Sequence, residues 1–88
     1  MKTIMFDKNA AHWNKNADHN LWFAKTQGLY LKDLFEARGY MYLNQICEHF
    51  GVEWNPDNYN LLYSANDGPI GFEFEPADEN NVLIHIKH

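Results

Sequence analysis

The chain has 88 residues, a length that forms one small domain. Doubly wound nucleotide-binding sheets and (β/α)8 barrels need far more chain, so the length excludes these enzyme architectures. Hydrophobic residues make up 45% of the chain and aromatic residues 16%, which is enough for a globular core. No apolar run approaches the roughly 18 to 20 residues that cross a bilayer, so no membrane partner is expected.

The formal net charge of -5 is unevenly distributed. Residues 1–40 hold six basic and four acidic residues, whereas residues 41–88 hold one basic and eight acidic residues. The C-terminal half should therefore repel nucleic-acid phosphates and attract a basic partner. The single cysteine, Cys47, excludes an internal disulfide. With no signal-peptide pattern at the N-terminus, this composition predicts a cytoplasmic protein.

The first half of the chain is predicted to be mainly helical. Residues 3–6 form a β-prone run that predicts an edge strand, and residues 8–20 predict a loop. From residue 21 to residue 38, apolar side chains recur at helical spacing, and Gly39 provides a terminator. The main apolar stripe of this predicted helix consists of Ala24, Gly28, Leu31 and Phe35.

A second, shorter helix is predicted after a direct helical corner at residues 39–43. Asn44 has the chemistry of an N-cap, and Gly51 that of a terminator. Apolar residues at helical spacing would form its buried side: Leu43, Ile46, Cys47 and Phe50. Residues 54–58 then have the Pro and Asx composition of a turn.

The last third predicts an antiparallel meander with strands at residues 60–64, 70–75 and 82–87. Phe72 and Phe74 alternate with Glu73 and Glu75, so the phenylalanines should face the helices and the glutamates should face water near His85 and Lys87.

The sequence therefore predicts an α+β fold, with two helices packed on a three- to four-stranded antiparallel sheet. Residues 1–88 form one domain, divided into an N-terminal strand and loop (1–20), a helical part (21–51) and an acidic β-meander (52–88). A homodimer through a free sheet edge fits this architecture, since residues 82–87 or the N-terminal strand would end the sheet.

Three segments carry a resemblance to known sequences: Arg38-Gly39-Tyr40-Met41-Tyr42-Leu43-Asn44-Gln45-Ile46 through Phe50-Gly51, Gly71-Phe72-Glu73-Phe74, and Val82-Leu83-Ile84. They resemble a group of small uncharacterised proteins encoded by phages and integrative mobile elements of Gram-positive bacteria. The resemblance extends over residues 21–88. It implies a mobile-element context and no established activity, so it carries over no catalytic residue.

The spacing of the candidate residues does not favour a catalytic, metal-binding or DNA-binding site. Cys47 and His49 diverge on a helix, and His85 and His88 point to opposite faces of a strand, so we expect no catalytic residue, no metal and no cofactor. The short helix offers only Gln45, Glu48 and His49 for major-groove contacts. A small DNA-binding regulator, or a minor enzyme with an unrecognised site, is therefore kept as the alternative.

The remaining feature is an acidic surface with aromatic neighbours. It predicts non-enzymatic binding of a host protein, for example inhibition of a basic defence nuclease of the anti-CRISPR kind by nucleic-acid mimicry. The expected partner-binding residues are Glu53, Trp54, Asp57, Tyr59, Tyr63, Asp67, Glu73, Glu75, Asp78 and Glu79.

Overall fold

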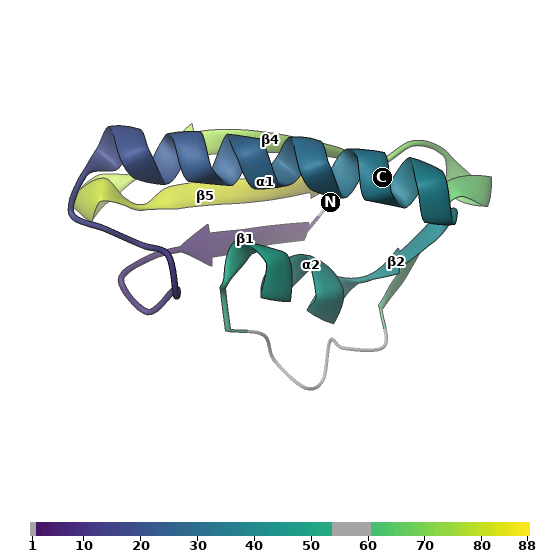
Figure 1. Ribbon diagram of the computed structural model, residues 1–88, viewed down its shortest axis with the longest axis horizontal. Helices are drawn as coiled ribbons and strands as arrows, with labels where there is room; N and C mark the ends of the chain where they lie inside the picture. Colours follow the sequence, from purple (N-terminus) through teal and green to yellow (C-terminus); the bar gives the residue numbers. More distant parts are fainter. Residues whose placement is uncertain (1, 54–60) are drawn as a thin grey trace.

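The computed structural model describes residues 2–53 and 61–88, and strands from both ends of the chain meet in its main sheet (Figure 1). The elements follow in the order β1 (Lys2–Phe6), α1 (Ala17–Arg38), β2 (Tyr40–Tyr42), α2 (Leu43–Phe50), β3 (Leu62–Ser64), η2 (Ala65–Asp67), β4 (Gly71–Pro76), η3 (Asp78–Asn80) and β5 (Val82–Lys87). The predicted α+β class is confirmed. Among the described residues, no helix is long and apolar enough to cross a membrane.

Helix α1 begins earlier than predicted because a side chain caps it. The Asn16 side chain accepts a hydrogen bond from the His19 N–H at 3.1 Å, so residues 17–20 are helical and not part of a loop. Gly39 ends the helix as predicted, with φ 84° and its N–H donated to the Phe35 carbonyl at 2.7 Å. All four members of the predicted stripe are buried.

The connection between the helices is a strand, which corrects the predicted helical corner. Residues 40–42 are extended, with the Met41 side chain fully buried and its neighbours exposed. Helix α2 follows at once, so its N-cap is Tyr42 and not Asn44; the Gln45 side chain accepts the Tyr42 N–H at 3.0 Å. All four predicted inward residues of α2 are buried, and the helix ends at Gly51 with φ 72°.

The sheet topology differs from a simple meander. The main sheet has the order β1-β5-β4 with both pairings antiparallel, so the closing strand is central, while the N-terminal strand is an edge as predicted. Strand β3 pairs with β2 instead of β4, with Met41 opposite Tyr63. The C-terminal strands are thus the β4–β5 hairpin, preceded by a strand that belongs to a second sheet.

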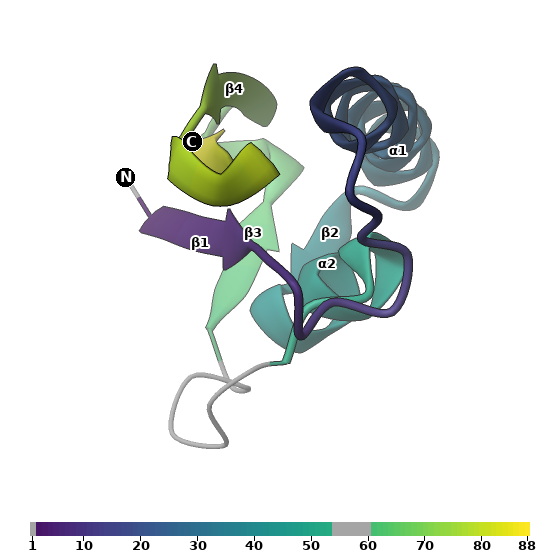
Figure 2. The ribbon, with the colours of Figure 1, turned by 90° about the vertical axis from the view of Figure 1, so that its left-hand side faces the viewer.

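Both helices lie on one side of the main sheet (Figure 2). The core between them includes Ile84 and Ile86 of β5, Phe35 of α1 and Phe50 of α2, all at most 1% exposed. Among the described residues, no helix covers the opposite side of the sheet. We call that opposite side the open face.

Candidate functional site

The open face carries the two glutamates that the sequence singled out. Strand alternation directs Phe72 and Phe74 toward the helices and Glu73 and Glu75 away from them. The Glu73 and Glu75 side chains are 60% and 62% exposed, although each has a basic partner on β5. This arrangement leaves two carboxylates accessible on an uncovered surface.

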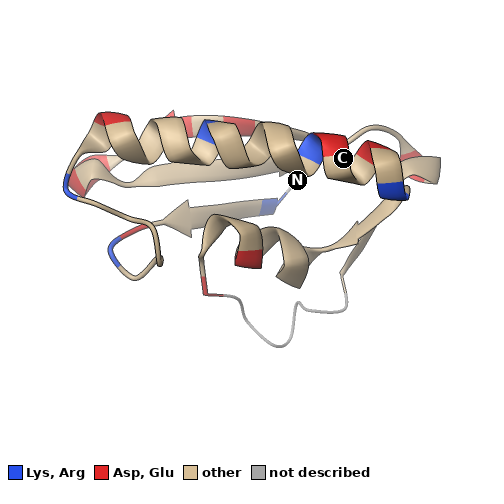
Figure 3. Ribbon diagram, in the orientation of Figure 1, with Lys and Arg blue, Asp and Glu red and all other residues tan. Residues whose placement is uncertain are grey.

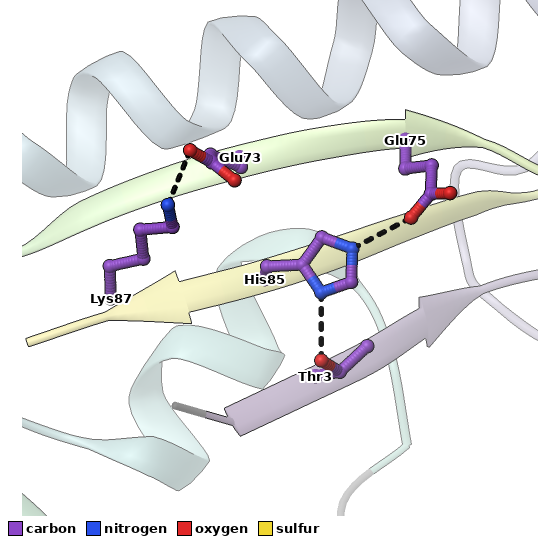
Figure 4. Close-up of polar contacts among 5 residues, drawn as sticks. All are labelled: Thr3, Glu73, Glu75, His85 and Lys87. Atoms are coloured by element: carbon purple, nitrogen blue, oxygen red, sulfur yellow. Dashed lines mark hydrogen bonds and ion pairs between the residues drawn. The ribbon is translucent and has the colours of Figure 1, made fainter.

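A row of polar contacts crosses the three strands (Figure 4). Glu75 Oε1 lies 3.0 Å from His85 Nε2, and His85 Nδ1 lies 2.8 Å from the Thr3 hydroxyl oxygen. Lys87 Nζ donates to Glu73 Oε1 in a second contact. The predicted proximity of the glutamates to His85 and Lys87 is therefore confirmed. Thr3 was missed, although its outward position follows from the alternation of residues 2–6.

The series Thr3, His85 and Glu75 has the chemical order of a hydroxyl, an imidazole and a carboxylate, as in hydrolytic triads. Such catalysis also needs a substrate cleft and donors for an oxyanion. None of the clefts described below is lined by these three residues. Their arrangement on the open face ties β1, β5 and β4 together. The exposed ion pair between Lys87 and Glu73 on the same face contributes about 0.2–1 kcal/mol.

The predicted acidic residues that the structure describes are spread over several elements of the fold (Figure 3). Asp67 lies in η2 before β4, whereas Asp78 and Glu79 lie in η3 after it. These turns are at opposite ends of a six-residue strand, which spans roughly 20 Å. Glu53 follows α2 and lines a cleft beside β1. The structure therefore brings together Glu73 and Glu75 on β4, keeps Asp78 and Glu79 adjacent in η3, and places Asp67 at the opposite end of β4 from η3.

The predicted aromatic anchors receive little support from the described residues. Tyr63 is only 7% exposed and stacks edge-on against His88, so its ring belongs to the core and is not available to a partner. Trp54, Asp57 and Tyr59 lie outside the described residues.

In the described parts of the chain, the histidine side chains pack against aromatic rings or make polar contacts. His12, His19 and His49 each lie against an aromatic ring, and His88 Nε2 lies 2.8 Å from the Ser64 carbonyl oxygen. Within residues 2–53 and 61–88, no three His, Cys, Asp or Glu side chains gather as metal ligands would. His85 and His88 do not converge, in line with the strand geometry.

A cleft of about 290 Å³ lies between β1 and helix α2, and Cys47 contributes to its lining. The Cys47 side chain is 2% exposed, which confirms its predicted place in the core. Burial raises the pKa of this thiol from 9.0 to about 11, although the Lys2 charge opposes the shift. The thiol is therefore protonated near neutral pH and is a poor nucleophile.

We expect two measurable consequences for Cys47. At about pH 8, its alkylation by iodoacetamide should be at least about ten-fold slower in the folded protein than in denaturant. Above pH 9 the unfolded thiol ionises while the folded thiol stays protonated, so the free energy of unfolding should fall as the pH rises toward about 11. Burial raises the pKa of the Tyr63 hydroxyl as well, so Tyr63 should also lower the free energy of unfolding as the pH rises.

Urea denaturation at increasing pH, with Cys47→Ala as the control, separates the two groups. The substitution should remove part of the decline and leave the part due to Tyr63. Equal declines in both proteins would show that the thiol does not contribute.

Comparison with known proteins found no matching family model, no matching curated protein and no matching solved structure. The resemblance to proteins of mobile elements stays a prediction that depends on the residues quoted for it.

Proposed function

We propose that this chain is a non-enzymatic binding protein whose open face, centred on Glu73 and Glu75, docks on a basic surface of another protein. The observation that supports this proposal is the exposure of both carboxylates on a sheet face that no described helix covers. Like-signed groups at alternate strand positions are about 7 Å apart, which suits neighbouring basic side chains on a partner.

The basic surface of a nuclease that normally contacts nucleic acid is the target class we favour. Carboxylates in place of phosphates would compete for the same lysines and arginines. The resemblance to proteins of phages and integrative elements adds a reason for such a target, because inhibition of a host defence nuclease, as in anti-CRISPR action, would serve a mobile element. In the free protein Lys87 neutralises part of the charge and His85 contacts Glu75, and the basic side chains of a partner would replace these contacts.

A paired charge reversal tests the proposal. Tagged protein is used to retain partners from a lysate of a Gram-positive host with its defence systems, at low and high salt, with mass spectrometry of the bound proteins. A basic nuclease retained at low salt should be lost at high salt. Glu73→Lys with Glu75→Lys should weaken its binding at least about ten-fold, because attraction becomes repulsion.

Asp33→Lys with Glu36→Lys is the matched control, since it changes the net charge equally on the exposed side of α1. Circular dichroism checks that both variants are folded. Retention of the partner by the Glu73 and Glu75 variant, or equal losses in the two variants, would contradict binding through the open face.

A further inference from the structure

A groove runs along the second edge of the main sheet, between β4 and α1. Within the described residues β4 pairs with β5 alone, so one side of the strand presents backbone groups without a neighbouring strand. The groove encloses about 420 Å³. Its lining includes Gly28, Leu29, Lys25 and Lys32 of α1, with Phe72 and Phe74 of β4.

The apolar wall of this groove is incompletely covered. Inward residues of the central strand, such as Ile84 and Ile86, are fully buried, whereas Phe72 and Phe74 on β4 are only half-buried. Leu29 on the facing helix is 70% exposed. Gly28 leaves the helix without a side chain here; a Cβ at this position would lie 2.6 Å from Phe74 Cζ. An apolar row and an open strand edge thus lie side by side.

We propose that β4 receives an extended segment of the basic partner as an additional strand. Backbone hydrogen bonds would extend the sheet, apolar side chains of the segment would face Phe72, Phe74 and Leu29, and basic side chains would lie beside Glu73 and Glu75 on the open face. This inference rests on the proposed function, because it specifies how the basic partner binds at the same carboxylates.

Opposite charges on the two sides of β4 would set the register of the added strand. The open face carries Glu73 and Glu75, whereas the groove side carries Lys25 and Lys32. A slip by one residue exchanges the two faces of a strand, which would place basic side chains against the lysines and apolar ones beside the glutamates. The segment should therefore alternate apolar and basic residues.

The same charges disfavour a second copy of this chain at the β4 edge. Antiparallel pairing of two β4 strands would bring the glutamates of one copy beside those of the other, and like charges on neighbouring strands are destabilising. A basic segment of a different protein avoids this repulsion and gains opposite-charge pairs in its place.

The test uses a synthetic peptide of about eight residues that alternates valine and lysine. We expect saturable binding in fluorescence titrations, with slower hydrogen exchange at the amides of β4. A peptide that alternates valine and glutamate should bind at least about ten-fold more weakly. Glu73→Lys with Glu75→Lys should reverse this preference, which a merely structural role of the two glutamates would not produce.

Two further comparisons isolate the strand edge. Leu29→Asp, on the exposed wall of the groove, should weaken binding of the valine–lysine peptide at least about five-fold. Leu62→Asp, at an exposed leucine of β3, should leave this binding unchanged. N-methylation of one alternate set of peptide amides should abolish binding, and methylation of the other set should not, because a strand pairs through every second residue.

The outcomes distinguish this inference from the proposed function. Absence of saturable binding at about 1 mM peptide, or binding without slower exchange at β4, overturns strand addition. If the protein partner is still lost on reversal of Glu73 and Glu75, the open face remains its docking surface. If that partner is retained by the variant, the proposed function is wrong, whether or not the peptide binds.

Discussion

Phe50→Ala is expected to lower the free energy of unfolding by about 3–5 kcal/mol. Phe50 is 0% exposed at the C-terminal end of α2, and its ring meets Phe72 and Phe74 edge-on, with centroid distances of 5.8 and 6.3 Å. Truncation would leave a cavity between the helix and β4 and remove contacts from both strand residues. Since small domains are stable by about 5–15 kcal/mol in total, this loss is a large share.

Equilibrium denaturation in urea measures the effect, and Phe50→Leu is the matched control. Leucine keeps most of the apolar volume, so its cost should be about 1.5 kcal/mol or less. A change below about 1 kcal/mol for Phe50→Ala would mean that α2 does not depend on this ring for its attachment to the sheet.

The helices were largely predictable because their signals are local. The spacing of Ala24, Gly28, Leu31 and Phe35 follows one helical turn after another, and all four residues are buried. Gly39 and Gly51 end their helices in the left-handed conformation that glycine adopts at low cost. The start of α1 was misplaced since the capping residue, Asn16, precedes the first apolar residue of the pattern.

Strand partners were not predictable to the same degree. Alternation assigns each side chain to a face but does not say which strand lies next to which. Strand β5 is central because it pairs with β4 on one side and with β1, from the other end of the chain, on the other side. Ile84 of β5 is therefore flanked by Ile4 and Phe74. The pairing of β2 with β3 joins segments of three residues each, too short to show a period.

The candidate site was predicted where alternation governs it and missed where turns govern it. Glu73 and Glu75 meet Lys87 and His85 because all four lie on the same face of paired strands. Asp67 and the acids of η3 lie in the turns before and after the strand predicted at residues 70–75, so their separation followed from that strand and was overlooked. The groove beside β4 depends on the approach of α1, which is non-local.

Asn20 is a buried polar residue that the sequence analysis did not identify. It is one of eleven asparagines, it was assigned to a loop, and its side chain is 0% exposed. Its Nδ2 donates to the carbonyls of Asn14 and Asn80 at 2.7 and 2.8 Å, and its Oδ1 accepts the Asn14 N–H at 2.9 Å. The Asn80 carbonyl belongs to a turn in which Glu79 and Asn80 have φ 62° and 64°.

Asn20→Ala is therefore expected to lower the free energy of unfolding by about 2–4 kcal/mol, because buried backbone groups in two segments lose their partners. Urea denaturation measures the loss, and hydrogen exchange should show it first around Asn14 and η3. The exposed Asn66→Ala is the control, with a change within about 0.5 kcal/mol. An equally small change for Asn20→Ala would show that water replaces the lost hydrogen bonds.

The pH dependence of the stability of Asn20→Asp tests the same hydrogen bonds. The ionised carboxylate can still accept the Asn14 N–H, but it would face two carbonyl oxygens with no proton to donate. Burial and these oxygens should raise the carboxyl pKa in the folded protein above its value of about 3.9 in the unfolded chain. The folded state then binds the proton more tightly, so the variant should recover stability as the pH falls below the raised pKa. A deficit relative to the unsubstituted protein that does not change between about pH 7 and pH 4 would contradict the donor role of the Asn20 amide.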